Sequence, residues 1–186
     1  MHRLIRTALI FIVTLSILSG AMLVKRAQAA SAKEIDIKVD AALERFTKEI
    51  GGAKKFLKEA RGVLVFPSVI KAGFGIGGEY GEGALRIGGK TVDYYSTAAA
   101  SIGFQLGAQS KTVILVFLDK DELKKFRNSS GWEIGVDGSV ALVTLGAGGS
   151  IDSTNIKAPI VGFVFSNKGL MYNLTLEGSK ITKLNR

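Results

Sequence analysis

Residues that commonly carry catalytic or metal chemistry are scarce in this chain of 186 residues. It has no cysteine, only two prolines and a single histidine, His2. Without cysteine it cannot form a disulfide, a thiolate zinc site or a cysteine nucleophile. Because no histidine follows His2, a Ser-His-Asp triad and a histidine-ligated metal site are excluded from the rest of the chain. We therefore expect no enzyme, no metal and no cofactor.

The first 29 residues have the features of a secretory signal peptide. Arg3 and Arg6 precede an uncharged, mostly apolar run over residues 7–24, and residues 27–29 read Ala-Gln-Ala, a pattern that signal peptidase recognises. We expect cleavage after Ala29 and a mature protein in the periplasm or outside the cell. The run is close to the minimum length of a membrane-spanning helix, so an uncleaved membrane anchor is the alternative.

The net charge is smaller once this segment is set aside. The full chain has 25 Lys+Arg and 16 Asp+Glu, a formal charge of +9. Four basic and no acidic residues lie in 1–29, which leaves a charge of +5 on residues 30–186. This modest excess is not typical of a nucleic-acid-binding protein. Residues 30–186 are long enough to form one domain whose core needs no disulfide.

Three helices are predicted from apolar periodicity and capping residues. Ser31 and Glu34 fit a capping box before an amphipathic helix over 32–50. A second helix is expected over 53–60, after Gly51-Gly52. A third is expected from Asp119 to about Arg127, with acidic residues in its first turn.

The rest of the domain has the pattern of β-structure. Residues 73–89 are rich in glycine, which favours strands with tight turns or bulges over helices. Further strands are predicted at 63–66 (stopped by Pro67), 91–96, 102–109, 112–118, 132–136, 140–145, 160–165, 170–176 and 180–184, with hairpin turns at 167–169 and 177–179. Residues 98–100 suit either a strand or a short helix. The predicted fold class is α+β: N-terminal amphipathic helices packed on a Gly-rich, mainly antiparallel sheet or partly closed barrel.

Three motifs have both a chemical and a structural interpretation. Gly73, Gly75 and Gly78 match the spacing of a dinucleotide fingerprint, but no helical pattern follows them, so we interpret them as glycines of curved, closely packed strands. Glu79 and Glu82 could act as an acid–base pair, but in a strand they lie on opposite faces. We favour solvated turn charges. The acidic group beginning at Asp119 lacks the spacing of a calcium loop and is interpreted as a helix cap.

A cluster of basic residues offers the best candidate binding surface. Lys54, Lys55, Lys58 and Arg61 lie within eight residues, beside Phe56 and Leu57. A basic amphipathic segment is typical of a membrane surface element, each cation being worth about 1 kcal/mol near an anionic leaflet. The alternative is an ordinary solvated face whose apolar residues pack inward. A second basic group at 124–127 is interpreted as the cation-bearing end of a helix.

Several motifs in order resemble one known domain family. They are ARGVLVFP at 60–67, GFGIGGEYGEGALRI at 73–87, GFQLGAQ at 103–109, and SNKGL at 166–170 followed by LEGS at 176–179. Together they resemble the lipid-binding SYLF domain, also called the Las17-binding actin-regulator family, over about residues 32–186. One element departs from the family pattern, because Tyr-Ser-Thr-Ala at 95–98 stands where members often have Trp-Ser-x-Pro. Eukaryotic members bind phosphoinositides and actin.

The resemblance implies lipid or membrane association rather than a substrate. The leading hypothesis is an exported, non-enzymatic domain that contacts anionic phospholipid headgroups through Lys54, Lys55, Lys58 and Arg61. The alternative is a structural or protein-interaction module of the envelope, which binds a protein partner or itself. An enzyme that uses carboxylates or a Ser-Lys pair ranks last, because histidine and cysteine are the commonest acid–base and nucleophilic groups.

Overall fold

The computed structural model describes residues 30–103, 109–143, 150–151, 156–166, 169–170, 176 and 178–186. The chain divides into two units, Met1–Ala30 and Ser31–Arg186, and the helices and strands below belong to the second unit. The expected signal peptide, most of the expected strands at 102–109 and 170–176, and parts of both expected hairpin turns lie outside the described residues.

The three predicted helices are confirmed as α2 (Ala32–Glu49), α3 (Ala53–Glu59) and α4 (Lys120–Asn128). Ser31 caps α2, its hydroxyl accepting from the Glu34 N–H at 3.2 Å, while the Glu34 carboxylate pairs with Lys38 at 2.6 Å. Gly52 separates α2 from α3 with a φ of 76°, which glycine adopts without strain. Among the described helices, none combines the length and the apolar character that a membrane crossing requires.

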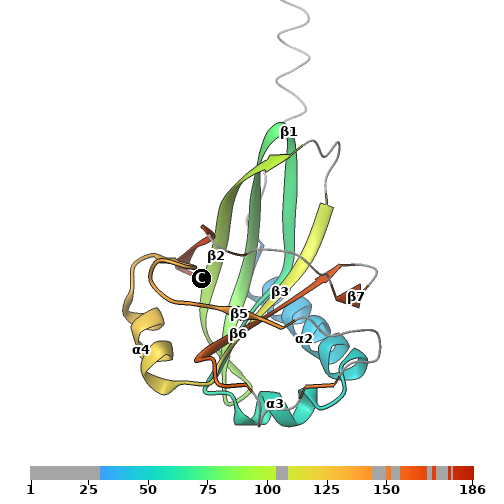
Figure 1. The fold of residues 1–186 in the computed structure, drawn as a ribbon, viewed down its shortest axis with the longest axis vertical. Helices are drawn as coiled ribbons and strands as arrows, with labels where there is room; N and C mark the ends of the chain where they lie inside the picture. The colour runs from blue at the N-terminus through green and yellow to red at the C-terminus, as the bar shows by residue number, and fades with distance from the viewer. Residues whose placement is uncertain are drawn as a thin grey trace, which may run out of the picture. The chain divides into compact units, whose positions relative to one another are not determined.

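The strands of the described residues form one curled, mostly antiparallel sheet, which confirms the α+β prediction (Figure 1). The sheet order is β4-β8-β2-β1-β3-β6-β5, with β7 beside β6, and only β5 and β6 pair in parallel. The strands are β1 (Gly62–Ile87), β2 (Lys90–Gly103), β3 (Gln109–Phe117), β4 (Trp132–Glu133), β5 (Ala141–Leu142), β6 (Ile160–Ser166), β7 (Gly169–Leu170) and β8 (Lys180–Leu184).

Several predicted strand limits are wrong. β1 does not stop at Pro67, because a register shift in its pairing with β3, between Phe66 and Val69, accommodates a residue that has no N–H to donate. β2 continues through residues 98–100, which excludes the short helix there, and joins the strands expected separately at 91–96 and 102–103. The strand expected at 132–136 is cut to two residues, since Gly135 has a φ of 91° and leads a turn.

β1 folds back on itself as an arch (Figure 1). Its first half, residues 62–71, pairs with β3, and its second half, residues 75–87, pairs with β2. The two halves approach so closely that a Cβ added at Gly83 would overlap the carbonyl oxygen of Val65, and one added at Gly81 would lie 2.8 Å from that of Ser68. Glycine at these positions therefore permits the close strand contact that the sequence predicted.

Hydrophobic clusters cover both faces of the central strands. Val113, Leu115 and Phe117 of β3 belong to one cluster, into which α4 inserts Phe126 with its ring 4.9 Å from Tyr95, 5.0 Å from Phe117 and 5.5 Å from Trp132. The alternate β3 residues, Ile114 and Val116, are buried outside this cluster. The helices α2 and α3 cover another part of the sheet, where their aromatic rings lie 4.8–5.9 Å from Phe163 of β6.

A polar cluster holds α2 against the second half of β1 and the start of β2. The Asp36 carboxylate accepts from the Thr91 hydroxyl at 2.6 Å and from the Tyr94 hydroxyl at 2.9 Å. Arg86 contributes its guanidinium, which lies 3.4 Å from Asp36 and 2.8 Å from Asp40. Half-buried groups with paired charges and hydrogen bonds fix the orientation of a helix more tightly than apolar contact alone.

The close contact inside β1 leads to the first prediction. Gly83→Ala should destabilise the fold by about 3 kcal/mol or more, because its methyl group would overlap backbone that cannot rotate away. Gly78→Ala in the same strand is the matched control, since its Cβ would meet Ala99 at 3.6 Å, an ordinary contact. Urea unfolding of both variants measures the difference. Equal free energies of unfolding for the two variants would contradict the close contact between the two halves of β1.

The buried Tyr95 phenol leads to the second prediction. Burial, assisted by the Asp93 charge and opposed by Arg127, raises the pKa of Tyr95 from 10 to about 12. Above pH 10 the unfolded chain loses this proton first, so the stability that it contributes is complete below pH 10 and is lost as the pH rises through 12. Tyr95→Phe should remove this part of the alkaline destabilisation.

At neutral pH the same variant should be at least as stable as the parent. The Tyr95 hydroxyl has no hydrogen-bond partner among the described residues, and burying an unpaired hydroxyl costs about 1–3 kcal/mol. Denaturant unfolding at pH 8, 10 and 11.5 compares the two proteins. Parallel pH profiles for parent and variant would show that Tyr95 titrates alike in the folded and unfolded chains.

Candidate functional site

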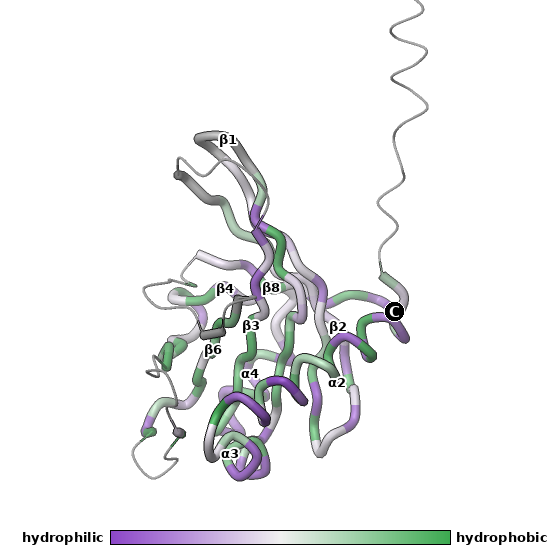
Figure 2. Tube along the Cα trace, turned by 90° about the vertical axis from the view of Figure 1, so that its right-hand side faces the viewer, coloured by the Kyte–Doolittle hydropathy of each residue, from purple (hydrophilic) through white to green (hydrophobic). Residues whose placement is uncertain are grey.

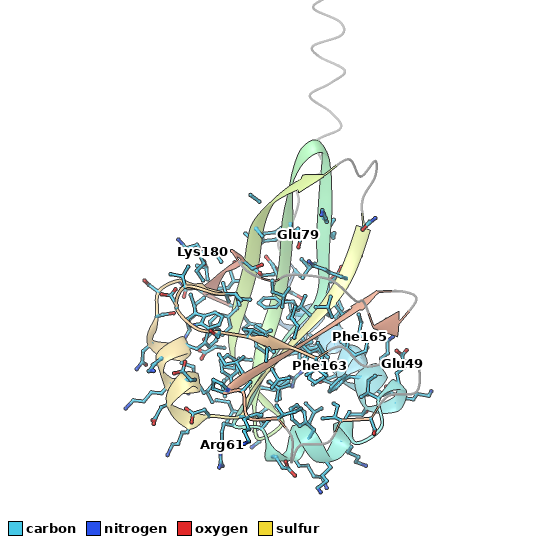
Figure 3. The ribbon with its side chains drawn as sticks, viewed as in Figure 1. Glu49, Arg61, Glu79, Phe163, Phe165 and Lys180 are labelled. Atoms are coloured by element: carbon cyan, nitrogen blue, oxygen red, sulfur yellow. The ribbon has the colours of Figure 1, made fainter. Side chains whose placement is uncertain are left out.

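The four cations predicted to bind lipid form one exposed surface. Lys54, Lys55 and Lys58 are exposed on α3, and Arg61 is exposed directly before β1 (Figure 3). None of the four forms an ion pair with a described acidic residue. We call these four residues the α3 basic surface. Its charge is therefore available to an external anion.

The burial of apolar neighbours turns these cations outward. Phe56 is 1% exposed, with its ring 5.9 Å from that of Phe163, and Ala53 is fully buried. Arg61 is anchored by its backbone, whose N–H donates to the Phe117 carbonyl at 2.8 Å. Inward packing of Phe56 fits both interpretations of this segment, the membrane element and the solvated face. The lipid-binding role of the α3 basic surface stays a prediction.

A pocket of about 390 Å³ lies beside the α3 basic surface. Lys58 is the only member of that surface that lines it. Its other charged residues are Asp40 and Arg86, which pair at 2.8 Å. Apolar and glycine residues complete the lining: Leu43, Leu57, Ala60, Gly62, Val63, Gly88 and Gly89. An apolar wall beside a cation suits an amphiphile better than a small polar substrate.

A second basic site was not predicted from the sequence. Lys120, Lys124 and Arg127 of α4 and Lys183 of β8 line a groove of about 440 Å³ together with Leu123 and Asn128. We call it the α4–β8 groove. The sequence assigned residues 124–127 to a helix end, but Lys125 lies outside the groove lining and pairs with Glu122 at 2.6 Å. The spacing of the three α4 cations was the available signal, and nothing local pointed to Lys183.

The interpretation of Glu79 and Glu82 as solvated turn charges is wrong. Both lie within β1, with side chains only 14% and 11% exposed. Glu79 pairs with Lys111 at 2.5 Å, while Glu82 pairs with Arg186 at 2.8 Å and accepts from the Tyr80 hydroxyl. Burial raises the pKa of Tyr80, and the neighbouring Glu82 raises it further. Each carboxylate is held by cations of its own, since Lys71 also lies 3.9 Å from Glu79, so the two do not form an acid–base pair.

The other motifs have structural roles. Asp119 caps α4, its carboxylate accepting from the backbone N–H groups of Asp121 and Glu122 at 2.8 and 2.9 Å, as the sequence indicated. The fingerprint-like glycines at 73–78 lie inside β1, which continues as a strand to Ile87, so the helix that would hold a pyrophosphate does not follow. Over the described parts of the chain, no group of three or more metal-ligating side chains is found.

Part of the chain matches a known protein family. Residues 98–186 match the family Ysc84, described as Las17-binding protein actin regulator. The match begins within β2 and includes α4, β6 and β8, so the α4–β8 groove lies in it and the α3 basic surface lies outside it. No curated protein matches the chain. The resemblance noted in the sequence is thereby confirmed over residues 98–186, which match the Ysc84, or SYLF, family, a family associated with lipid and actin binding.

Proposed function

We propose that this protein is a non-enzymatic, exported domain that binds anionic lipid headgroups through the α3 basic surface. The observation that supports it most directly is the group of four exposed cations that no described acidic residue neutralises. The family is a non-catalytic one associated with lipid and actin binding, which agrees with a binding rather than a catalytic role. Anionic phospholipids would meet these cations in the headgroup layer.

Electrostatics alone makes this a weak interaction. Four cations at about 1 kcal/mol each would give about 4 kcal/mol, which corresponds to a dissociation constant of about 1 mM. Tighter binding needs an apolar contribution. The pocket beside Lys58 supplies one candidate, because its wall contains Leu43, Leu57 and Val63. We infer that headgroup attraction brings the protein to the surface and that this pocket receives part of a lipid.

Export to the envelope is the second part of the proposal. It rests on the sequence of residues 1–29, with basic residues, an apolar run and Ala27-Gln28-Ala29 in the order of a cleavable signal. Absence of cysteine is compatible with any compartment. An uncleaved segment would instead act as an anchor and keep the domain at the membrane.

A protein-interaction role is the second candidate, and exposed apolar residues on β1 favour it. Ile70 is 52% exposed in the first half of the β1 arch, and Tyr80 is 52% exposed in the second half. Exposed apolar side chains that form a contiguous patch are typical of contact surfaces. A stable dimer with no affinity for vesicles would support this role and contradict the lipid-binding proposal.

The third prediction tests the α3 basic surface. Reversing the charge of Lys54, Lys55 and Lys58 to Glu should abolish co-sedimentation with vesicles of phosphatidylglycerol and phosphatidylcholine. The matched control reverses Lys33 and Lys48 of α2 and Lys90 of β2, which are also exposed, form no ion pair in the described segments and change the net charge equally. The control should retain most of its binding.

Salt and lipid composition sharpen this experiment. Binding of the parent protein should weaken as salt rises, because ions screen charges that are exposed to solvent. It should be weak on vesicles of phosphatidylcholine alone. Equal binding to neutral and anionic vesicles, or equal loss in both triple variants, would remove the α3 basic surface from the proposal.

The fourth prediction concerns export. Protein isolated from the envelope or the medium of cells that express the full chain should begin at Ala30, as measured by N-terminal sequencing and intact mass. Replacing Ala27 and Ala29 by large residues should leave the longer form attached to membranes, because signal peptidase requires small residues there. Full-length parent protein found only in the cytosol would contradict export.

A further inference from the structure

The α4–β8 groove gathers cations from two distant parts of the chain. Lys120, Lys124 and Arg127 are spaced by four and three residues, which places them along one side of α4. Lys183 reaches the same groove from β8, and Leu123 between them is only 7% exposed. The groove therefore has a cationic lining over an apolar base.

Asp93 holds two of these cations in position. Its carboxylate accepts from Arg127 at 3.2 and 3.3 Å through one oxygen and pairs with Lys183 at 2.5 Å through the other. The Asp93 side chain is 11% exposed, whereas those of Arg127 and Lys183 are 41% and 44% exposed. Both cations keep N–H donors that the carboxylate does not use. They are thus fixed in place while part of each faces solvent.

The charge of the groove remains unbalanced. Four cations line it, and the single charge of Asp93 balances one of them. Lys120 and Lys124 form no ion pair with any acidic residue in the described segments. Among the acids at this end of α4, Glu122 pairs with Lys125 and Asp119 caps the helix, while Asp121 is exposed, lies outside the groove lining and forms no ion pair in the described segments. An anion with two negative charges would suit this excess.

We propose that the α4–β8 groove binds a phosphate monoester. Arg127 and Lys183 are the donors that Asp93 holds in place, and Lys120 and Lys124 are the cations, unpaired within the described segments, that complete the site. A phosphate monoester carries close to two negative charges at neutral pH and offers three strong acceptor oxygens. Arginine presents paired N–H donors that match two phosphate oxygens, and lysine adds a point charge. The groove volume of about 440 Å³ leaves room for a small group beyond the phosphate.

The phosphate can belong to a soluble ester or to a lipid headgroup. The fold brings the groove close to the α3 basic surface, because the Arg61 N–H donates to Phe117, three residues before Lys120 in the chain. Both views of the fold place α3 and α4 away from the tip of the β1 arch (Figures 1 and 2). A site in this position can receive a headgroup or a free ester, and the proposal does not depend on the α3 basic surface.

The fifth prediction uses soluble phosphates. Titration of the protein, as produced from the full chain, with inorganic phosphate and glycerol 3-phosphate should shift amide NMR signals of residues 120–128 and 180–184. Lys124→Ala should weaken the affinity for both ligands about fivefold, which is the effect of removing one cation near anionic phosphate groups. The double variant Lys120→Ala with Lys124→Ala should weaken it about 25-fold. Lys125→Ala is the matched control on the same helix and should leave the affinity unchanged.

A vesicle experiment separates the two sources of phosphate. Vesicles of phosphatidic acid present a monoester, and phosphatidylglycerol vesicles matched in surface charge present a diester. For a headgroup site, the parent should prefer phosphatidic acid and the Lys120/Lys124 variant should lose that preference. For a soluble ester, the variant should lose glycerol 3-phosphate binding and bind both vesicles as the parent does.

Two results would overturn the proposal. One is unchanged phosphate affinity in the Lys120/Lys124 variant, with thermal unfolding confirming that it is folded. The other is that phosphate shifts only signals outside α4 and β8. Charge reversal of Lys54, Lys55 and Lys58 should leave soluble phosphate binding intact, so failure at the groove is distinguishable from failure at the α3 basic surface.

Discussion

The close crossing of the two halves of β1 is the constraint on which the rest of the fold depends. Gly83 lies against the Val65 carbonyl with no room for a side chain, so one strand can serve both parts of the sheet. Its first half pairs with β3, which β6 and β5 follow in the sheet, and its second half pairs with β2, which β8 and β4 follow. The curl that results creates the hydrophobic cluster that α4 closes with Phe126. A Gly-rich composition is therefore a packing requirement in this protein.

The candidate binding surfaces follow from how the helices cover this sheet. Phe56 packs against β6 and turns the lysines of α3 outward, while Phe126 packs into the curl and leaves the basic side of α4 exposed. Asp36 and Asp93 have similar roles, because the carboxylate of each binds a side chain that belongs to a different helix or strand. The packing that stabilises each helix therefore also determines which of its cations are exposed to solvent.

Local features of the chain are predictable from its sequence, and pairings between distant segments are not. The helix ends, the Asp119 cap and the limits of β8 agree with the periodicity and capping residues that predict them. Pro67 predicts a strand end because its missing N–H is a local property, but a register shift compensates for it. The sequence predicts a solvated Glu79 carboxylate, because its partner Lys111 is 32 residues away and nothing local indicates the pairing. The α3 basic surface is contiguous in sequence, whereas the α4–β8 groove is not.

The sequence by itself determined what chemistry the chain can hold. Its lack of cysteine, and of histidine beyond His2, excluded most nucleophilic and metal sites, and the ordered motifs indicated the family that residues 98–186 confirm. Only the tertiary structure brought Lys183 beside Lys124, and Glu79 beside Lys111. The physical reason is that β-pairing joins segments of any separation, and its register depends on packing against the whole core rather than on neighbouring residues.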